Sequence, residues 1–140
     1  MIIFSVPGNP VGKERPRKGK SGFYTPQKTQ DYEKLVKLCC IKAMKRDNTK
    51  KLDGQLEVRI TAFFEPLKKL TKTKKMRDSF DMNGMYPIVT PDCDNIAKSI
   101  CDALNGIAYD DDRQITDLSI IKRHSHVSGV EVSIKKCGGY

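Results

Sequence analysis

The stretch LEVRITAFF, residues 56–64, carries the clearest structural pattern in the chain. Mostly polar side chains separate apolar ones, which stand at every second position: Leu56, Val58, Ile60, Ala62 and Phe64. Because side chains along a strand point alternately to its two faces, this pattern predicts a β-strand with one buried face. Pro66 ends the strand because proline has no N–H to donate to a sheet.

Amphipathic helices are predicted on both sides of this strand. Before it, apolar residues recur at helical spacing. We expect that helix to begin with Thr25 as N-cap and Pro26 at the first helical position, and to end near Arg46. After the strand, a second helix is predicted over Asp94–Asn105, with Gly106 as its stop.

Three further strands complete the predicted set: Ile2–Val6, Gln114–Arg123 and Val130–Lys135. The 140 residues then form one α+β domain, a mixed or antiparallel sheet packed with two main helices. Residues 13–20 are too basic, and too broken by proline and glycine, for regular structure. We expect them and residues 67–86 to be mobile basic segments, the latter with at most a short helix.

The net charge of +9 is unevenly distributed. Residues 1–90 carry 20 Lys or Arg and 9 Asp or Glu, whereas residues 91–140 carry 6 and 8. A basic body with a local acidic cluster favours a protein that holds a polyanion and acts on it. Composition alone does not separate DNA from RNA or from an acidic lipid surface.

The cysteines and the N-terminal residues bear on the compartment. The five cysteines are an odd number and contain no CxxC pair, so we expect free thiols in a reducing cytosol. Residues 1–4 lack the charged start of a signal peptide, and the apolar runs are too short to span a membrane. We expect a cytoplasmic protein with no membrane partner.

The acidic cluster begins at PDCDNIAK, residues 91–98, and continues at residues 110–112. Asp92 and Asp94 lie at the start of the second predicted helix, and the other three aspartates follow its end. A helix of this length spans roughly 18 Å, so the two groups meet only if the connection folds back. Carboxylates gathered in one cleft repel one another unless their pKa values rise or a divalent cation binds. Oxygen ligands without His or Cys favour Mg²⁺ or Mn²⁺.

Each part of this cluster also has an ordinary structural interpretation. Asp94 is a good helix N-cap, and residues 110–112 are typical of a solvated turn. Lys98 is correctly spaced to pair with Asp94 or Asp102 on one helix face. Only the complete series of these residues, in this order, favours a catalytic site over the ordinary structural roles.

The segment TPDCDNIAKSICDALNGIAYDDDRQI, residues 90–115, resembles the RusA family of Holliday-junction resolvases. The pattern of that family is D-x-D-N-x-x-K, then D-A-L, then a short loop and D-D-x-Q-I/V, and all of it is present. PGNPVGKERPR (7–17) and YTPQKTQDYE (24–33) are similar to the opening of the subfamily found in Gram-positive phages. The resemblance therefore covers almost the whole chain.

This resemblance implies a site and an activity. Asp92, Asp94 and Asp112 correspond to metal-binding catalytic carboxylates, Lys98 to the essential lysine, and Asp111 is a second-line candidate ligand. The family forms homodimers that grip a four-way DNA junction and nick two opposed strands symmetrically with Mg²⁺ or Mn²⁺. The expected role is recombination and repair of DNA, in a bacterial cell and from a phage or prophage gene.

The basic segments then become candidate DNA contacts. In KERPRKGK (13–20) the candidates are Lys13, Arg15, Arg17, Lys18 and Lys20. Such a segment can follow a phosphate backbone, and LKKLTKTKKMR (67–77) is a second candidate. Among the aromatic residues, Tyr24 and Phe80 lie near basic side chains.

Two other functions remain open from the sequence. A non-catalytic phage protein that binds branched or single-stranded DNA would explain the charge but not the ordered aspartates. A metal-dependent phosphohydrolase acting on nucleotides would explain the aspartates but not the basic segments.

Overall fold

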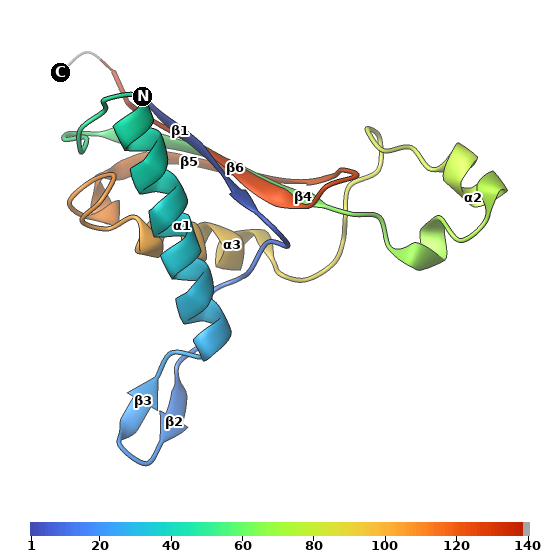
Figure 1. Cartoon of the computed structure of the whole chain (residues 1–140), viewed down its shortest axis with the longest axis horizontal. Helices are drawn as coiled ribbons and strands as arrows, with labels where there is room; N and C mark the ends of the chain where they lie inside the picture. Colours follow the sequence, from blue (N-terminus) through green and yellow to red (C-terminus); the bar gives the residue numbers. More distant parts are fainter. Residues whose placement is uncertain (139–140) are drawn as a thin grey trace.

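The computed structural model describes residues 1–138. Its centre is a four-stranded sheet in the order β1 (Ile2–Pro7), β6 (Gly129–Lys136), β4 (Leu56–Phe64) and β5 (Ile115–His124). Strand β6 runs antiparallel to β1 and β4, whereas β4 and β5 are parallel. The predicted α+β domain with a mixed sheet is confirmed (Figure 1).

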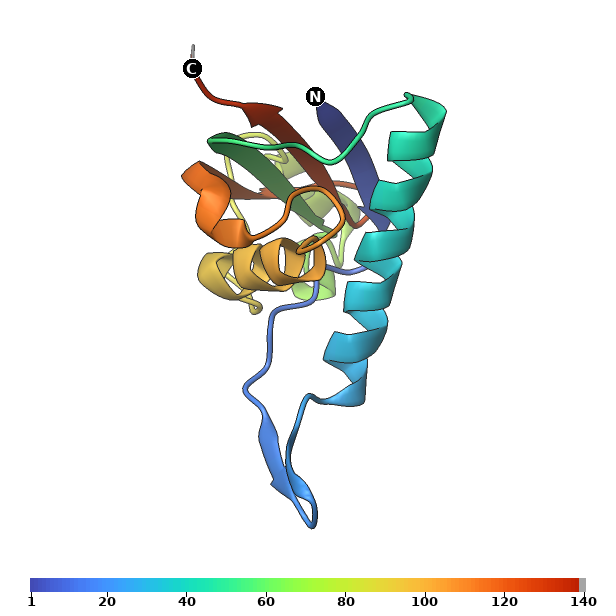
Figure 2. The same cartoon turned by 90° about the vertical axis from the view of Figure 1, so that its left-hand side faces the viewer.

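Two long helices, α1 (Gln27–Arg46) and α3 (Cys93–Ala103), cover one face of this sheet (Figure 2). The alternating apolar residues of β4 point toward them, with Leu56, Val58, Ile60 and Ala62 at most 2% exposed. Partners on the neighbouring strands lie in register: Ile60, for example, stands beside Val132 of β6 and Ile120 of β5. The strand that dominates the sequence therefore forms the centre of the core.

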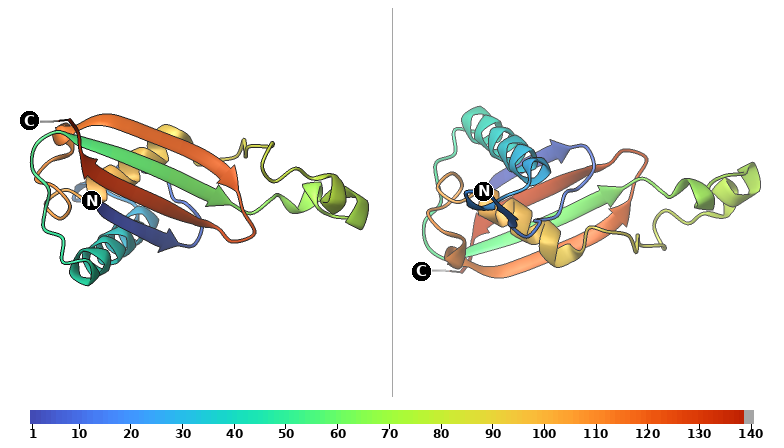
Figure 3. Two further views of the ribbon diagram at one scale, coloured as in Figure 1. Left: turned by 90° about the horizontal axis from the view of Figure 1, so that it is seen from above. Right: turned by 90° about the horizontal axis from the view of Figure 1, so that it is seen from below.

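The parallel pair β4 and β5 needs a crossover connection, and this connection carries the acidic cluster. It contains the short helices η1 (Lys68–Leu70), α2 (Lys74–Ser79) and η2 (Asp112–Gln114), as well as α3. Because the crossover returns to the edge of the sheet, α3 lies beside β5 (Figure 3).

Two basic parts project from the body in different directions (Figures 1 and 3). One is the arm that contains η1 and α2, in which no residue of either helix is buried. The other is a hairpin of β2 (Arg17–Gly19) and β3 (Gly22–Tyr24). The expectation of no regular structure over residues 13–20 is therefore wrong for β2, and Gly22, with φ of +109°, supplies the turn conformation.

Both helix starts differ from the sequence-based expectation. Helix α1 begins at Gln27, with Pro26 and not Thr25 in the N-cap position. Helix α3 begins at Cys93 with Asp92 as N-cap, so Asp94 lies inside the first turn. The hypothesis that Asp94 caps the helix is therefore wrong, and capping does not explain why an aspartate stands at this position.

All five cysteines are unpaired, as expected, and Cys40 and Cys101 are buried. Over residues 1–138 no helix combines the length and apolarity that a membrane crossing requires.

Candidate active site

One face of helix α3 lies against the core and a neighbouring stripe faces a pocket. Ile96 and Ile100 are completely buried. The stripe facing the pocket repeats every three or four residues, as one side of a helix does, and consists of Asp94, Ala97, Lys98, Cys101 and Asp102. The helix thus presents two carboxylates and a lysine over a small apolar surface.

The connection after α3 folds back, as the acidic-cluster hypothesis requires. The Asn105 side chain accepts a hydrogen bond from the Asp112 N–H at 2.8 Å. The buried hydroxyl of Tyr109 donates to the Cys101 carbonyl at 2.7 Å. Gly106, with φ of +80°, takes a left-handed conformation that favours glycine. These contacts hold the loop, and Asp112 with it, against the end of the helix.

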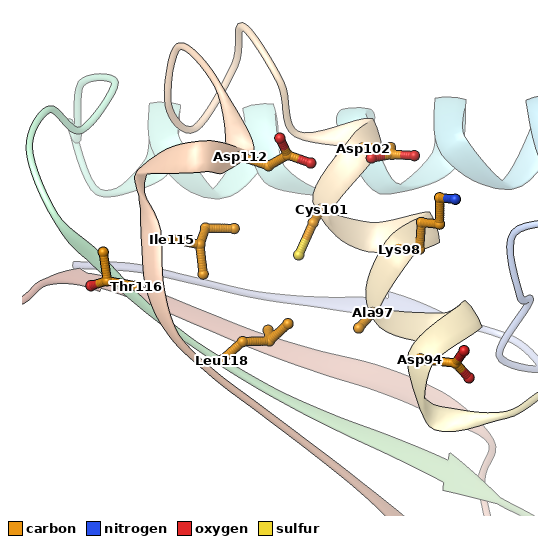
Figure 4. Close-up of a pocket in the computed structure, with 9 residues that line it drawn as sticks. All are labelled: Asp94, Ala97, Lys98, Cys101, Asp102, Asp112, Ile115, Thr116 and Leu118. Carbon is orange, nitrogen blue, oxygen red and sulfur yellow. The ribbon is translucent and has the colours of Figure 1, made fainter.

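The pocket that results has a volume of about 450 Å³ and lies between α3 and β5. Figure 4 shows Asp112 beside Asp102 at one end of the pocket and Asp94 at the other. Three residues from the start of β5 complete its wall: Ile115, Thr116 and Leu118. Acidic groups over an apolar wall provide a setting in which charge interactions are stronger than in water.

The two neighbouring aspartates of the loop have different environments. Asp111 is the N-cap of η2: its side chain accepts a hydrogen bond from the Arg113 N–H at 2.9 Å, and the Gln114 side-chain oxygen accepts one from the Asp111 N–H at 3.1 Å. The Arg113 N–H holds the pKa of the Asp111 carboxyl below its usual range. Asp112 makes no such cap and faces the pocket.

The surroundings of Asp112 disfavour the charged form of its carboxyl group. Partial burial raises its pKa above the usual range, and the nearby carboxylates of Asp111 and Asp102 add to the effect. A positive ion between Asp112 and Asp102 would remove this repulsion.

Asp92 lies outside the residues that line the pocket. It occupies the N-cap position of α3, but its side chain makes no capping hydrogen bond and remains exposed. The structure therefore brings Asp94, Lys98 and Asp112 to one pocket and leaves Asp92 beside it, at the start of the same helix.

The donor chemistry of the pocket fits a hard divalent cation. Within residues 1–138, no three acidic, histidine or cysteine side chains gather closely enough to form a complete metal cluster. Mg²⁺ does not need one, because it is usually held by one or two carboxylates, with waters and substrate phosphates as the other ligands. The facing pair of Asp112 and Asp102 is of this kind.

Among the candidate DNA contacts, Lys13 has a different environment from the rest. Its ammonium lies 2.5 Å from Glu33 of α1 and 3.7 Å from Asp102, and its side chain is only 20% exposed. Its backbone N–H donates to the Asn95 carbonyl of α3 at 2.9 Å. Lys13 thus joins the start of the basic segment to both helices and to the pocket.

The other four candidates are exposed to solvent: Arg15, Arg17, Lys18 and Lys20. Of these, Arg17 forms an ion pair with Glu14 at 3.2 Å. These side chains are thus accessible to a large polyanion.

Asp102 is the site residue that sequence reasoning passed over. In the sequence it belongs to the D-A-L stretch and has the spacing of a surface partner for Lys98. In the structure it lines the pocket, faces Asp112 and pairs with Lys13. The available signal was its position eight residues after Asp94, on the same helix face.

The chain was compared with protein-family models and with curated proteins. A family model described as "Endodeoxyribonuclease RusA" matches residues 7–135. A protein of Bacillus subtilis (strain 168), "Uncharacterized protein YqaN", is 31% identical over 139 residues, and the alignment covers 96% of each chain. The name of that relative states no activity. The family match includes the hairpin, the arm and the whole pocket.

Proposed function

Since the chain belongs to the RusA endodeoxyribonuclease family, we propose that it is a Mg²⁺-dependent, structure-selective endonuclease that resolves four-way junctions and other branched DNA by paired symmetric nicks. The single observation that carries this proposal is the pocket that joins Asp94 and Lys98 of α3 to Asp112 of the loop that follows it. A solvated turn at residues 110–112 does not explain this arrangement, and neither does a capping role for Asp94.

The proposed core of the metal site is the facing pair Asp112 and Asp102. Asp94, at the other end of the pocket, and Asp92, at the start of the same helix, are the further proposed ligands. When bound, Mg²⁺, or Mn²⁺ in its place, would supply Lewis-acid activation of the phosphodiester and of the attacking water.

Lys98 is the cationic residue among those that line the pocket. Asp102, which is correctly spaced to pair with it, is in contact with Lys13 instead, and Lys98 faces the pocket. Its ammonium can donate a hydrogen bond to a non-bridging phosphate oxygen and stabilise the negative charge that builds up during hydrolysis. Ala97 and Leu118 form part of the apolar lining of the same pocket, and apolar surroundings strengthen such an interaction.

The exposed basic residues of the hairpin and the arm are the proposed contacts to DNA phosphates. Helix α3 lies between these two parts (Figure 1), so a strand held by both would pass close to the pocket. A four-armed junction has two-fold symmetry, and a homodimer would give it two equivalent cleavage sites. We assign the protein to recombination and repair in the bacterial cytoplasm, as the product of a phage or prophage.

A cleavage assay with labelled substrates tests this function. A four-way junction, a flap and a linear duplex are each incubated with the protein in Mg²⁺ and in EDTA. We expect paired nicks in the junction that require Mg²⁺ and little cutting of the duplex. Asp94→Asn removes a charge without removing a helix cap, so it should abolish nicking and preserve junction binding. Wild-type nicking by this variant would reject the assignment of the site.

A further inference from the structure

Phe23, in the β2–β3 hairpin, is the most exposed aromatic residue of the described chain, with 77% of its surface accessible. In the register of the hairpin it stands opposite Lys18, so both side chains lie on the same face. The hairpin extends away from the sheet and from α1 (Figure 2), and Phe23 is not among the residues that pack against the hydrophobic core. A single exposed phenylalanine is common, but its placement among cations at the end of a projecting hairpin is specific.

The neighbouring aromatic residue is held differently. Tyr24 lies across Gly19, where an added Cβ would approach its ring to 3.1 Å. Glycine at this position therefore lets the Tyr24 ring pack along one face of the hairpin. Phe23 and Lys18 lie on the opposite face of the hairpin.

The base of the hairpin is fixed although its end is free. On one side, Lys13 is attached to α3 and to Glu33 of α1. On the other side, the Gln30 side chain donates to the Thr25 carbonyl at 2.5 Å. The hairpin that carries Phe23 is thus attached to both helices at its base.

We propose that Phe23 stacks on an unpaired or unstacked base at the branch point of the DNA, while Lys18 contacts the adjoining phosphate. This inference rests on the proposed function, since it names the feature of the substrate that the enzyme selects. Within a duplex the base faces are covered by their neighbours and only the edges are accessible. At a branch point a base can be splayed out, and an aromatic ring then stacks on it without regard to sequence.

A second copy of the chain is the other conceivable partner for Phe23. If the hairpin met its own copy across a two-fold axis, Arg17, Lys18 and Lys20 of the two copies would come close together, and like charges brought together are unfavourable. The charge of the hairpin therefore favours DNA.

The test measures binding in EDTA, so that it does not depend on cleavage. Junctions and linear duplexes carry the fluorescent base 2-aminopurine, at the branch point of the junction or at the matching duplex position. Phe23→Leu keeps an apolar side chain but removes the stacking ring. Phe23→Trp keeps an aromatic ring, and Val127→Ala removes another exposed apolar side chain from a distant turn.

We expect the wild type to change the fluorescence at the branch point, and Phe23→Leu to lose that change. Phe23→Leu should also weaken junction binding about tenfold, within the range for loss of one base–aromatic stack. Its duplex affinity should stay unchanged, and Phe23→Trp and Val127→Ala should bind as the wild type does. Equal junction affinity of Phe23→Leu and wild type, or an equal loss on both DNAs, would overturn the proposal, as would a changed oligomeric state with unchanged binding. If the wild type binds as expected but never cuts in Mg²⁺, the nuclease function fails and the stacking role stands.

Discussion

At the scale of single residues, Asp111 and Asp112 are neighbouring aspartates with different surroundings. The first caps η2 and its pKa is lowered by the Arg113 N–H. The second faces the pocket, and burial and neighbouring carboxylates raise its pKa. A cap stabilises the fold, whereas a carboxylate whose ionised form is disfavoured destabilises it at neutral pH. The two residues should therefore respond differently to the same substitution.

We predict that Asp112→Asn reduces cleavage at least about 100-fold, because bound metal contributes several kcal/mol to such reactions. The same change should raise the melting temperature in EDTA, since it removes the repulsion with Asp102. Asp111→Asn serves as the matched control and should retain most of the activity, because asparagine also caps helices. Nuclease assays and thermal melts of both variants check this. Equal losses of activity would contradict the division of roles.

Lys13 gives a second prediction at this scale. Lys13→Met leaves Glu33 and Asp102 without their shared cation and should cost about 1–2 kcal/mol of unfolding free energy, between the values for exposed and buried pairs. Cleavage should fall because Asp102 is no longer held in position, and Lys13→Arg should restore part of both properties.

The salt dependence of DNA binding separates this positioning role from a phosphate contact. For Lys13→Met, the slope of log K against log salt should match that of the wild type and of the exposed-lysine control Lys50→Met. A shallower slope for Lys13→Met alone would assign Lys13 to the DNA after all.

At the scale of elements, prediction from the sequence succeeded where burial imposes a pattern. Leu56–Phe64 was predicted with its observed bounds, because its alternate residues face the core. The β2–β3 hairpin was missed, since strands of three residues with exposed basic side chains carry no periodic pattern. The start of α3 was placed too late because Asp92 and Asp94 are equally good caps by residue type. Asp102 was missed because only the folded loop brings Asp112 next to it.

The hairpin also supports a prediction at this scale. Replacing Arg17, Lys18 and Lys20 together by glutamine removes up to three phosphate contacts. The slope of log K against log salt should then become shallower by about 2 to 3. Junction and duplex binding should weaken alike, which distinguishes this effect from that of Phe23→Leu. An unchanged slope would exclude the hairpin from the DNA interface.

At the scale of the whole molecule, the proposed DNA contacts and the proposed metal site lie in different parts of the chain. The hairpin and the arm, which project from the body (Figure 1), carry part of the exposed cations, and helix α1 carries others, such as Lys34, Lys37 and Lys42. The carboxylates of the pocket lie between α3 and β5. A homodimer would double this arrangement around one axis. Analytical ultracentrifugation should give twice the protomer mass, and a single protomer at all concentrations would contradict the paired-nick model.

Binding of Mn²⁺ measured by electron paramagnetic resonance tests the central claim most directly. If α3 and the loop before β5 together form one cation site, then Asp94→Asn and Asp112→Asn should each weaken or abolish the same saturable binding seen in the wild type. Asp110→Asn, which neutralises an exposed loop carboxylate outside the pocket, should bind Mn²⁺ as the wild type does. Wild-type Mn²⁺ binding by Asp112→Asn would contradict the claim.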